Sequence, residues 1–135
     1  MAGGKLVGSM KKKILIIDDD EAMRWLIKKM LEKDFEVDAF SHVGNALKHM
    51  NMYGKPDVII TDIHLPVIDG KDFLTNLKTN GLYSGIPIIV ISSRQDVVTK
   101  EQCLKAGADD YLLKPFNPER LIESITNVME NKKQA

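Results

Sequence analysis

The sequence has 135 residues, a length that suits one domain, because single hydrophobic cores commonly hold about 100 to 150 residues. Hydrophobic residues make up 44% of the chain and charged residues 28%, which argues against a disordered, collagen-like or small disulfide-rich protein. Lys and Arg number 19 and Asp and Glu also 19, so no overall positive field draws the protein to nucleic acid or to an anionic membrane.

The two ends of the chain differ in composition from the part between them. Residues 1–9 are mostly small and precede a second methionine, Met10, and a lysine run. We interpret residues 1–9 as an added expression tag and exclude them from the fold. The domain then spans residues 10–130, and residues 131–135 are expected to form a frayed polar tail.

Short apolar runs alternate along the domain with segments of helical period. The runs 14–17, 58–60 and 88–91 are continuous and rich in β-branched residues, which is typical of central strands covered on both faces. Residues 35–40 alternate between apolar and polar, as an edge strand does. Residues 111–113 supply a short fifth strand.

Five further segments carry apolar residues at helical spacing and are predicted helices. The apolar positions that mark them are Met23, Leu26, Ile27 and Met30; Val43, Ala46, Leu47 and Met50; Phe73, Leu74 and Leu77; Val98 and Leu104; and Leu121, Ile125 and Val128. Right-handed crossovers lay each helix on a face of the sheet, so the pattern predicts one (βα)5 α/β sandwich with a five-stranded parallel sheet. Ligands of such sheets bind beyond the carboxyl ends of the strands.

Cysteine, histidine and apolar content limit where the protein works. The single Cys103 allows no internal disulfide and no metal site made of several cysteines. Such low cysteine content is typical of proteins in a reducing compartment. No apolar stretch is long enough to cross a bilayer, and the start lacks the apolar region of a secretory signal. No histidine has a zinc-like spacing, and His42 and His49 are expected to face solvent. We therefore expect a cytoplasmic protein.

Carboxylates follow two strands that we expect to be neighbours. Asp18, Asp19 and Asp20 come directly after the first strand, and Asp62 comes after the third. Each could simply shape its loop, since Asp20 can cap the helix that begins near Glu21 and aspartate suits turns. When the aspartates are considered together, their mutual repulsion matters. Two carboxylates roughly 4 Å apart repel each other by about 4 kcal/mol at an effective dielectric near 20, and a cation relieves this repulsion. Oxygen ligands alone favour Mg²⁺.

A hydroxyl and an ammonium follow the other two strands. The fourth strand ends in Ser92, and Lys114 and Pro115 follow the fifth. Each is an ordinary residue by itself, but beside the carboxylates they form a site for a tetrahedral anion such as phosphate. The glycine-rich loops that bind nucleotide phosphates are absent from the sequence. The remaining route is covalent: a carboxylate, for which Asp62 is the candidate, attacks phosphorus and forms an acyl phosphate.

These residues make the chain similar to the receiver domains of two-component response regulators over residues 12 to about 130. The residues that carry the resemblance, in order and at the family's spacing, are Ile14, Leu15, Ile16, Ile17, Asp18 and Asp19; Asp62, Pro66, Asp69 and Gly70; Ser92; and Lys114, Pro115 and Phe116. The resemblance implies the strand order 2-1-3-4-5 and a role in phosphorelay signal transduction.

The resemblance also implies a role for each site residue. Asp62 accepts phosphate from the phosphohistidine of a sensor histidine kinase or phosphotransfer protein. Asp18 and Asp19, with Asp62, hold Mg²⁺ directly or through water, and the backbone carbonyl of His64 supplies another ligand. Lys114 pairs with the phosphoryl group.

The phosphoryl group is expected to act as a switch. By the resemblance, Ser92 donates a hydrogen bond to the group after transfer, and the ring of Tyr111 turns inward in response. This rotation of the ring alters the face made by the fourth helix, the fifth strand and the fifth helix, where a target protein binds. Tyr111 could instead be a plain core or edge aromatic residue. The bond between Lys114 and Pro115 is expected to be cis, a form that proline alone reaches at little cost.

Such a domain promotes only its own phosphorylation and dephosphorylation, so we do not expect an enzyme. One rival is a phosphohydrolase of the haloacid dehalogenase type, whose Asp-x-Asp signature the run at Asp18 could imitate. That signature has Thr or Val at the position that Ala22 occupies in this chain. A second rival is an adaptor that keeps the fold without the chemistry, although all key residues are present. A stand-alone receiver and a receiver within a larger regulator or hybrid kinase both stay open.

Overall fold

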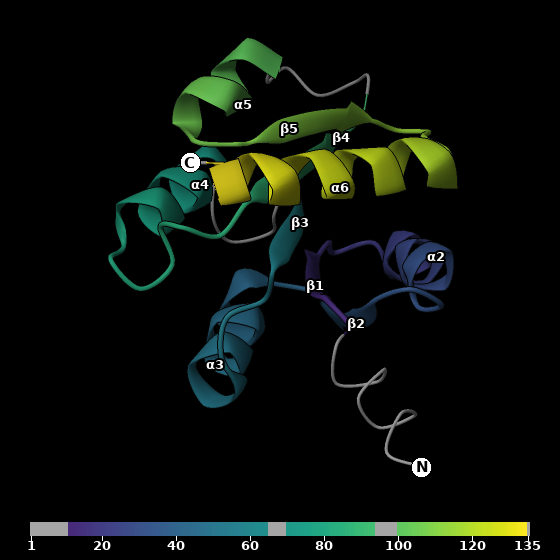
Figure 1. Ribbon diagram of the computed structural model, residues 1–135, viewed down its shortest axis with the longest axis horizontal. Helices are drawn as coiled ribbons and strands as arrows, with labels where there is room; N and C mark the ends of the chain where they lie inside the picture. Colours follow the sequence, from purple (N-terminus) through teal and green to yellow (C-terminus); the bar gives the residue numbers. More distant parts are fainter. Residues whose placement is uncertain (1–10, 65–69, 94–99, 135) are drawn as a thin grey trace.

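The computed structural model describes residues 11–64, 70–93 and 100–134 of the chain, shown in Figure 1. Strands and helices alternate along these residues. They are β1 Lys13–Ile17, α2 Glu21–Leu31, β2 Glu36–Phe40, α3 Val43–Tyr53, β3 Val58–Asp62, α4 Gly70–Thr79, β4 Ile88–Ser92, α5 Lys100–Ala106, β5 Asp110–Leu113 and α6 Pro118–Gln134. The expected tag and Val98 lie outside the described residues.

The five described strands form one parallel sheet with the order β2-β1-β3-β4-β5. In Figure 1 the sheet runs from β5 at the top to β2 below, with α3 on its left and α2 on its right. This arrangement confirms the predicted fold class and strand order. The edge strand β2 is half-buried to exposed along its length, whereas β3 and β4 are buried throughout. The alternating and continuous apolar patterns of these strands follow from this difference.

The sheet separates two hydrophobic cores. One joins alternate strand side chains to α2 and α6, through Ile27 and Leu121 among others. The other joins the intervening strand side chains to α3, α4 and α5, through Ala46, Leu74 and Cys103. Successive side chains of a strand point to opposite faces, so strands buried on both faces need apolar residues at every position.

Side chains and glycine fix the ends of two helices. The side chain of Asp20 accepts hydrogen bonds from the backbone N–H groups of Ala22 at 3.0 Å and Met23 at 3.4 Å, so it caps α2. At the end of α3, Gly54 has a φ of +97°, a conformation that L side chains rarely adopt. Its N–H donates to the carbonyl of Met50 at 2.9 Å and closes the last turn.

Several side chains depart from the expectations. Leu26 and Leu104, which we placed on apolar stripes, are 40% and 41% exposed. For α2 the reason is the helical period, because the buried Ile27 and Leu31 stand four residues apart and turn Leu26 toward the rim. His49, expected to face solvent, is half-buried against the rings of neighbouring residues.

The last helix extends into the expected polar tail. Helix α6 continues to Gln134, so residues 131–134 form its last turn. The segment is polar yet free of glycine and proline, which permits the helix to continue. Among the described residues, no helix combines the length and the apolar character that crossing a bilayer requires.

Candidate functional site

Three carboxylates meet at the carboxyl ends of β1 and β3. In the register of these strands Ile17 pairs with Thr61, which places the next residues, Asp18 and Asp62, side by side. Carboxylate oxygens of Asp18, Asp19 and Asp62 all lie within 4.8 Å of one another. Asp18 is 0% and Asp62 7% exposed, whereas Asp19 is open to solvent. The cluster therefore combines two buried acids with one that faces water.

A single ammonium lies between the two buried acids. The Nζ atom of Lys114 is 3.3 Å from Oδ2 of Asp18 and 3.3 Å from Oδ2 of Asp62. Lys114 follows β5, so its side chain extends past β4 to reach the ends of β1 and β3. Its backbone N–H donates to the carbonyl of Ser92 at 2.8 Å, and the peptide bond between Lys114 and Pro115 is cis.

Burial and neighbouring charge shift the pKa of Asp18. Burial raises its pKa to about 6, and the negative charge of Asp62 adds to the rise. The N–H of Asp20, which donates to Oδ1 of Asp18 at 2.9 Å, and the ammonium of Lys114 oppose it. Burial alone would lower the pKa of Lys114, but the two carboxylates outweigh it and raise that pKa above its usual value. Among the residues that the structure describes, the clustered carboxylates thus outnumber the one lysine that contacts them.

The donor set fits a hard divalent cation. All the clustered groups are carboxylates, which are ligands that Mg²⁺ prefers, and the open side at Asp19 leaves room for the waters that Mg²⁺ retains. A cation at this position would also offset the repulsion that raises the pKa of Asp18. His64 follows in the turn after β3, where its N–H donates to Oδ1 of Asp62 at 3.1 Å. The proposed use of its carbonyl stays a prediction.

Ser92 and Tyr111 lie on the next two strands. Asp62 pairs in register with Ile91, so Ser92 ends β4 one residue further along, fully buried. Its hydroxyl donates to the carbonyl of Ser93 at 3.3 Å. Tyr111 pairs in register with Val90 and is half-buried. It lines a groove of about 550 Å³ together with residues that belong to or adjoin α5, β5 and α6. Of the residues that carried the sequence resemblance, Pro66 and Asp69 lie outside the described residues.

Two contacts of the site were not foreseen. Arg24, on the first turn of α2, donates from Nη1 to the backbone carbonyl of Asp18 at 2.7 Å. Thr61 donates from its hydroxyl to the carbonyl of Asp62 at 3.0 Å. Both support the backbone of an acidic residue without touching its carboxylate. No spacing rule in the sequence marks them, because each depends on how the loop after a strand folds back.

Comparisons with known proteins agree with this geometry. A family model described as the response regulator receiver domain matches residues 14–126. The chemotaxis protein CheY of Halobacterium salinarum is 32% identical over 122 residues, covering 89% of this chain and 98% of that protein. A crystal structure of a response regulator receiver domain protein from Clostridium thermocellum is 31% identical with a TM-score of 0.81, covering 91% of this chain and 98% of that one.

Longer proteins match as well. Histidine kinase P4 of Formosa agariphila is 32% identical over 122 residues, which are 90% of this chain and 9% of the kinase. The chain therefore spans nearly the full length of one curated relative and less than a tenth of another.

Proposed function

Because the chain belongs to the response regulator receiver domain family of two-component phosphorelay signalling, we propose that it accepts a phosphoryl group on Asp62 in a Mg²⁺-dependent reaction. One observation carries the proposal: three carboxylates lie within 4.8 Å of one another, and two of them, Asp18 and Asp62, share Lys114 at 3.3 Å. A structural ion pair would balance the charges. An excess of buried carboxylate suits a site that a cation and a phosphoryl group complete.

The chemistry follows from the placement of the side chains. A carboxylate oxygen of Asp62 attacks phosphorus of a phosphohistidine, the P–N bond breaks, and its electron pair returns to the imidazole nitrogen. The N–H of His64 holds Oδ1 of Asp62 and the ammonium of Lys114 lies at Oδ2, so the carboxylate is oriented before the donor arrives. Lys114 then neutralises part of the charge of the transferred group. Bound Mg²⁺ would supply the remaining charge stabilisation, held by Asp18, Asp19, Asp62 and the carbonyl of His64.

The phosphorylated site then acts as a switch. The new group adds about −1.5 to −2 charge units next to Ser92. A hydrogen bond from that hydroxyl contributes about 1.5 to 3 kcal/mol, whereas shifting a two-state equilibrium from 1:99 to 99:1 needs about 5.5 kcal/mol. Ser92 therefore has to act with a second element. Tyr111 stands one strand away and lines the groove between α5 and α6, so we assign it the role of carrying the change to the α5-β5-α6 face.

The partners follow from the chemistry of the site. We infer a sensor histidine kinase or a histidine phosphotransfer protein as the phosphoryl donor, and a downstream protein as the target of the α5-β5-α6 face. The match to a histidine kinase and to a chemotaxis regulator supports a signalling role rather than turnover of an unrelated substrate. We infer that the protein acts in the cytoplasm. We expect neither nucleic acid nor membrane to bind through this domain.

A small phosphoryl donor tests the proposal. Protein incubated with acetyl phosphate and Mg²⁺ should gain the mass of one phosphoryl group, and EDTA should prevent the gain. Asp62→Asn should show no gain, and the matched variant Asp34→Asn, an exposed aspartate in the turn before β2, should behave as the wild type. A phosphoryl gain that survives in Asp62→Asn would rule out Asp62 as the acceptor.

A further inference from the structure

A second group of charged and aromatic side chains lies at the opposite end of the strands. It surrounds a pocket of about 220 Å³ between α3 and the β2 edge of the sheet, with the buried residues Leu15 and Pro56 in its lining. Lys13 at the start of β1 also lines the pocket. Asp38 pairs in register with Leu15, three residues before Asp18, and a strand rises about 3.3 Å per residue, so this pair lies roughly 10 Å from Asp18 along the strand. The pocket is therefore separate from the aspartate site.

Two carboxylates, one ammonium and one imidazole line the pocket. The ammonium of Lys13 is 3.9 Å from the carboxylate of Glu36, and Nε2 of His49 is 3.3 Å from the carboxylate of Asp38. The ammonium of Lys13 therefore pairs with Glu36, whereas the partner of Asp38 is an imidazole. The side chain of Asp38 is 41% exposed, so a ligand can reach its carboxylate.

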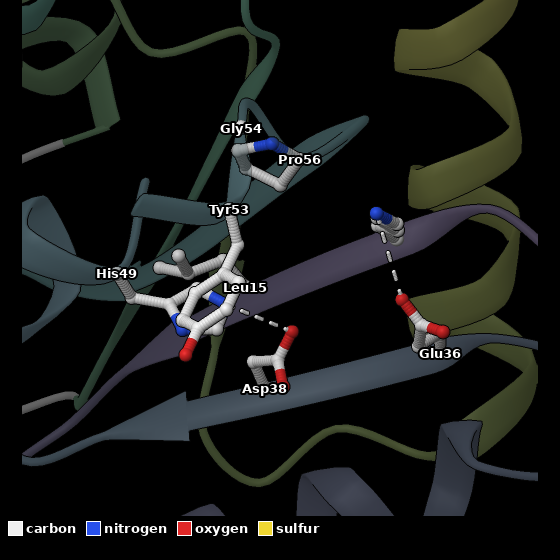
Figure 2. Close-up of a pocket in the computed structure, with 8 residues that line it drawn as sticks. Leu15, Glu36, Asp38, His49, Tyr53, Gly54 and Pro56 are labelled. Carbon is white, nitrogen blue, oxygen red and sulfur yellow. Dashed lines mark ion pairs between the residues drawn. The ribbon is translucent and has the colours of Figure 1, made fainter. Parts of the chain in front are cut away.

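Aromatic rings stand beside that carboxylate. The ring of His49 lies between Phe40 and Tyr53, with centroid separations of 5.0 Å and 4.8 Å. Figure 2 shows Asp38, His49 and Tyr53 grouped together, with Glu36 and its ion pair further away. Tyr53 is 66% exposed, so its ring is accessible from solvent. A carboxylate next to an accessible aromatic ring favours a cation, which both groups attract.

We propose that this pocket binds a small organic cation with a guanidinium head, held by the carboxylate of Asp38 and the ring of Tyr53. A guanidinium is planar, donates two parallel hydrogen bonds to one carboxylate and stacks on aromatic rings. The pocket is smaller than the roughly 300 to 1,000 Å³ of drug-sized ligand sites, so the bound group has only a few non-hydrogen atoms. The exposed carboxylate of Asp38 disfavours phosphate and carboxylate ligands. The head belongs either to a free guanidine compound or to an arginine side chain of a partner.

An NMR titration of the whole chain with ethylguanidinium tests the proposal. We expect saturable backbone amide shifts confined to Asp38, His49, Tyr53 and Gly54. Asp38→Asn should weaken the apparent affinity at least about tenfold, because a charged hydrogen bond is lost. Tyr53→Ala should weaken it about threefold through the lost ring contact. The matched control Glu101→Gln, whose parent side chain on α5 is 79% exposed, should leave the affinity unchanged.

Two further probes make the outcome decisive. Ethylurea has the shape of ethylguanidinium without its charge and should give no saturable shifts. An arginine-containing tripeptide that binds more tightly than ethylguanidinium would identify a partner side chain as the source of the head, and weaker binding would identify a free compound. Equal binding of ethylurea, or unchanged affinity in a folded Asp38→Asn variant, would overturn the proposal. The result does not depend on the chemistry of Asp62, because Asp62 does not line this pocket.

Discussion

Two pairs of aspartates near strand ends show opposite ways of holding negative charge. The first pair is Asp109, just before β5, and Asp110, at its start. Asp109 accepts hydrogen bonds from Nζ of Lys78 at 3.0 Å and from the N–H of Ile88 at 2.8 Å. Asp110 accepts from the hydroxyl of Ser124 at 2.6 Å and from the N–H of Tyr111 at 2.8 Å. These carboxylates tie α4, β4, β5 and α6 together. Each has dedicated donors of its own.

The aspartates after β1 and in β3 are held differently. Asp18 and Asp62 share Lys114, and burial raises the pKa of Asp18 to about 6. A carboxyl group with a raised pKa lowers the stability of the folded protein at neutral pH. We infer that the first pair stabilises the fold, whereas the buried charge of Asp18 in the second pair costs folding free energy that a bound cation would offset. Substitutions in and around each pair can test this division.

The largest effect is expected beside the structural pair, at Gly107. This residue has a φ of +121°, and an added Cβ would lie 2.5 Å from Cγ of Lys78, the lysine that binds Asp109. Gly107→Ala should lower the free energy of unfolding by about 3 kcal/mol, through backbone strain and displacement of Lys78. Urea denaturation measures this value. Gly85→Ala, with nothing within 4 Å of the added Cβ, is the control and should change it little.

Removing a structural carboxylate should have the next largest effect. Asp109→Ala leaves the N–H of Ile88 and the ammonium of Lys78 without this acceptor and should lower the free energy of unfolding by about 2 kcal/mol. At temperatures where the variant is folded, its phosphorylation by acetyl phosphate should proceed at the wild-type rate. A strong loss of phosphorylation in folded protein would show that this aspartate belongs to the functional pair.

Removing a site carboxylate should have a smaller effect of the opposite sign. In EDTA at pH 7.5, Asp18→Asn should raise the free energy of unfolding by about 1 to 2 kcal/mol, because it removes a buried charge that repels Asp62. The pKa of Asp18 is higher in the folded than in the unfolded state, so the wild type binds more protons when folded. Its stability relative to the variant should therefore fall as pH rises from about 4 to 6.

Urea denaturation at pH 4, 5, 6 and 7.5 measures this dependence. Saturating Mg²⁺ should stabilise the wild type and leave Asp18→Asn nearly unchanged, because the variant lacks a ligand. A stability difference that is the same at pH 4 and 7.5 would mean that the charge of Asp18 is fully compensated, and the functional pair would then cost no folding free energy.

The sequence predicts the functional pair better than the structural one. Continuous apolar runs mark buried parallel strands, and their carboxyl ends converge, so Asp18, Asp62, Ser92 and Lys114 could be expected at one edge. The contact of Lys78 with Asp109 joins residues 31 positions apart and depends on how α4 lies against the turn before β5. No local pattern predicts such a distance.

The pocket beside β2 was also hidden from sequence reasoning. His49 is polar and stands next to an apolar stripe, so we placed it in solvent. Its partners Asp38 and Phe40 belong to a different element, and only the packing of α3 on β2 brings the rings together. Periodicity predicts which face of a helix is buried. It does not predict which polar side chain at the border of that face contacts a residue of another element.

We propose that the carboxylate of Asp62 is the group that takes the phosphoryl group. Borohydride reduces an acyl phosphate to an alcohol, so trapping followed by peptide mapping identifies the modified residue. After treatment with acetyl phosphate and Mg²⁺, we predict homoserine at position 62 and unmodified aspartate at positions 18 and 19. Homoserine at either of those positions, or at none of the three, would contradict this claim.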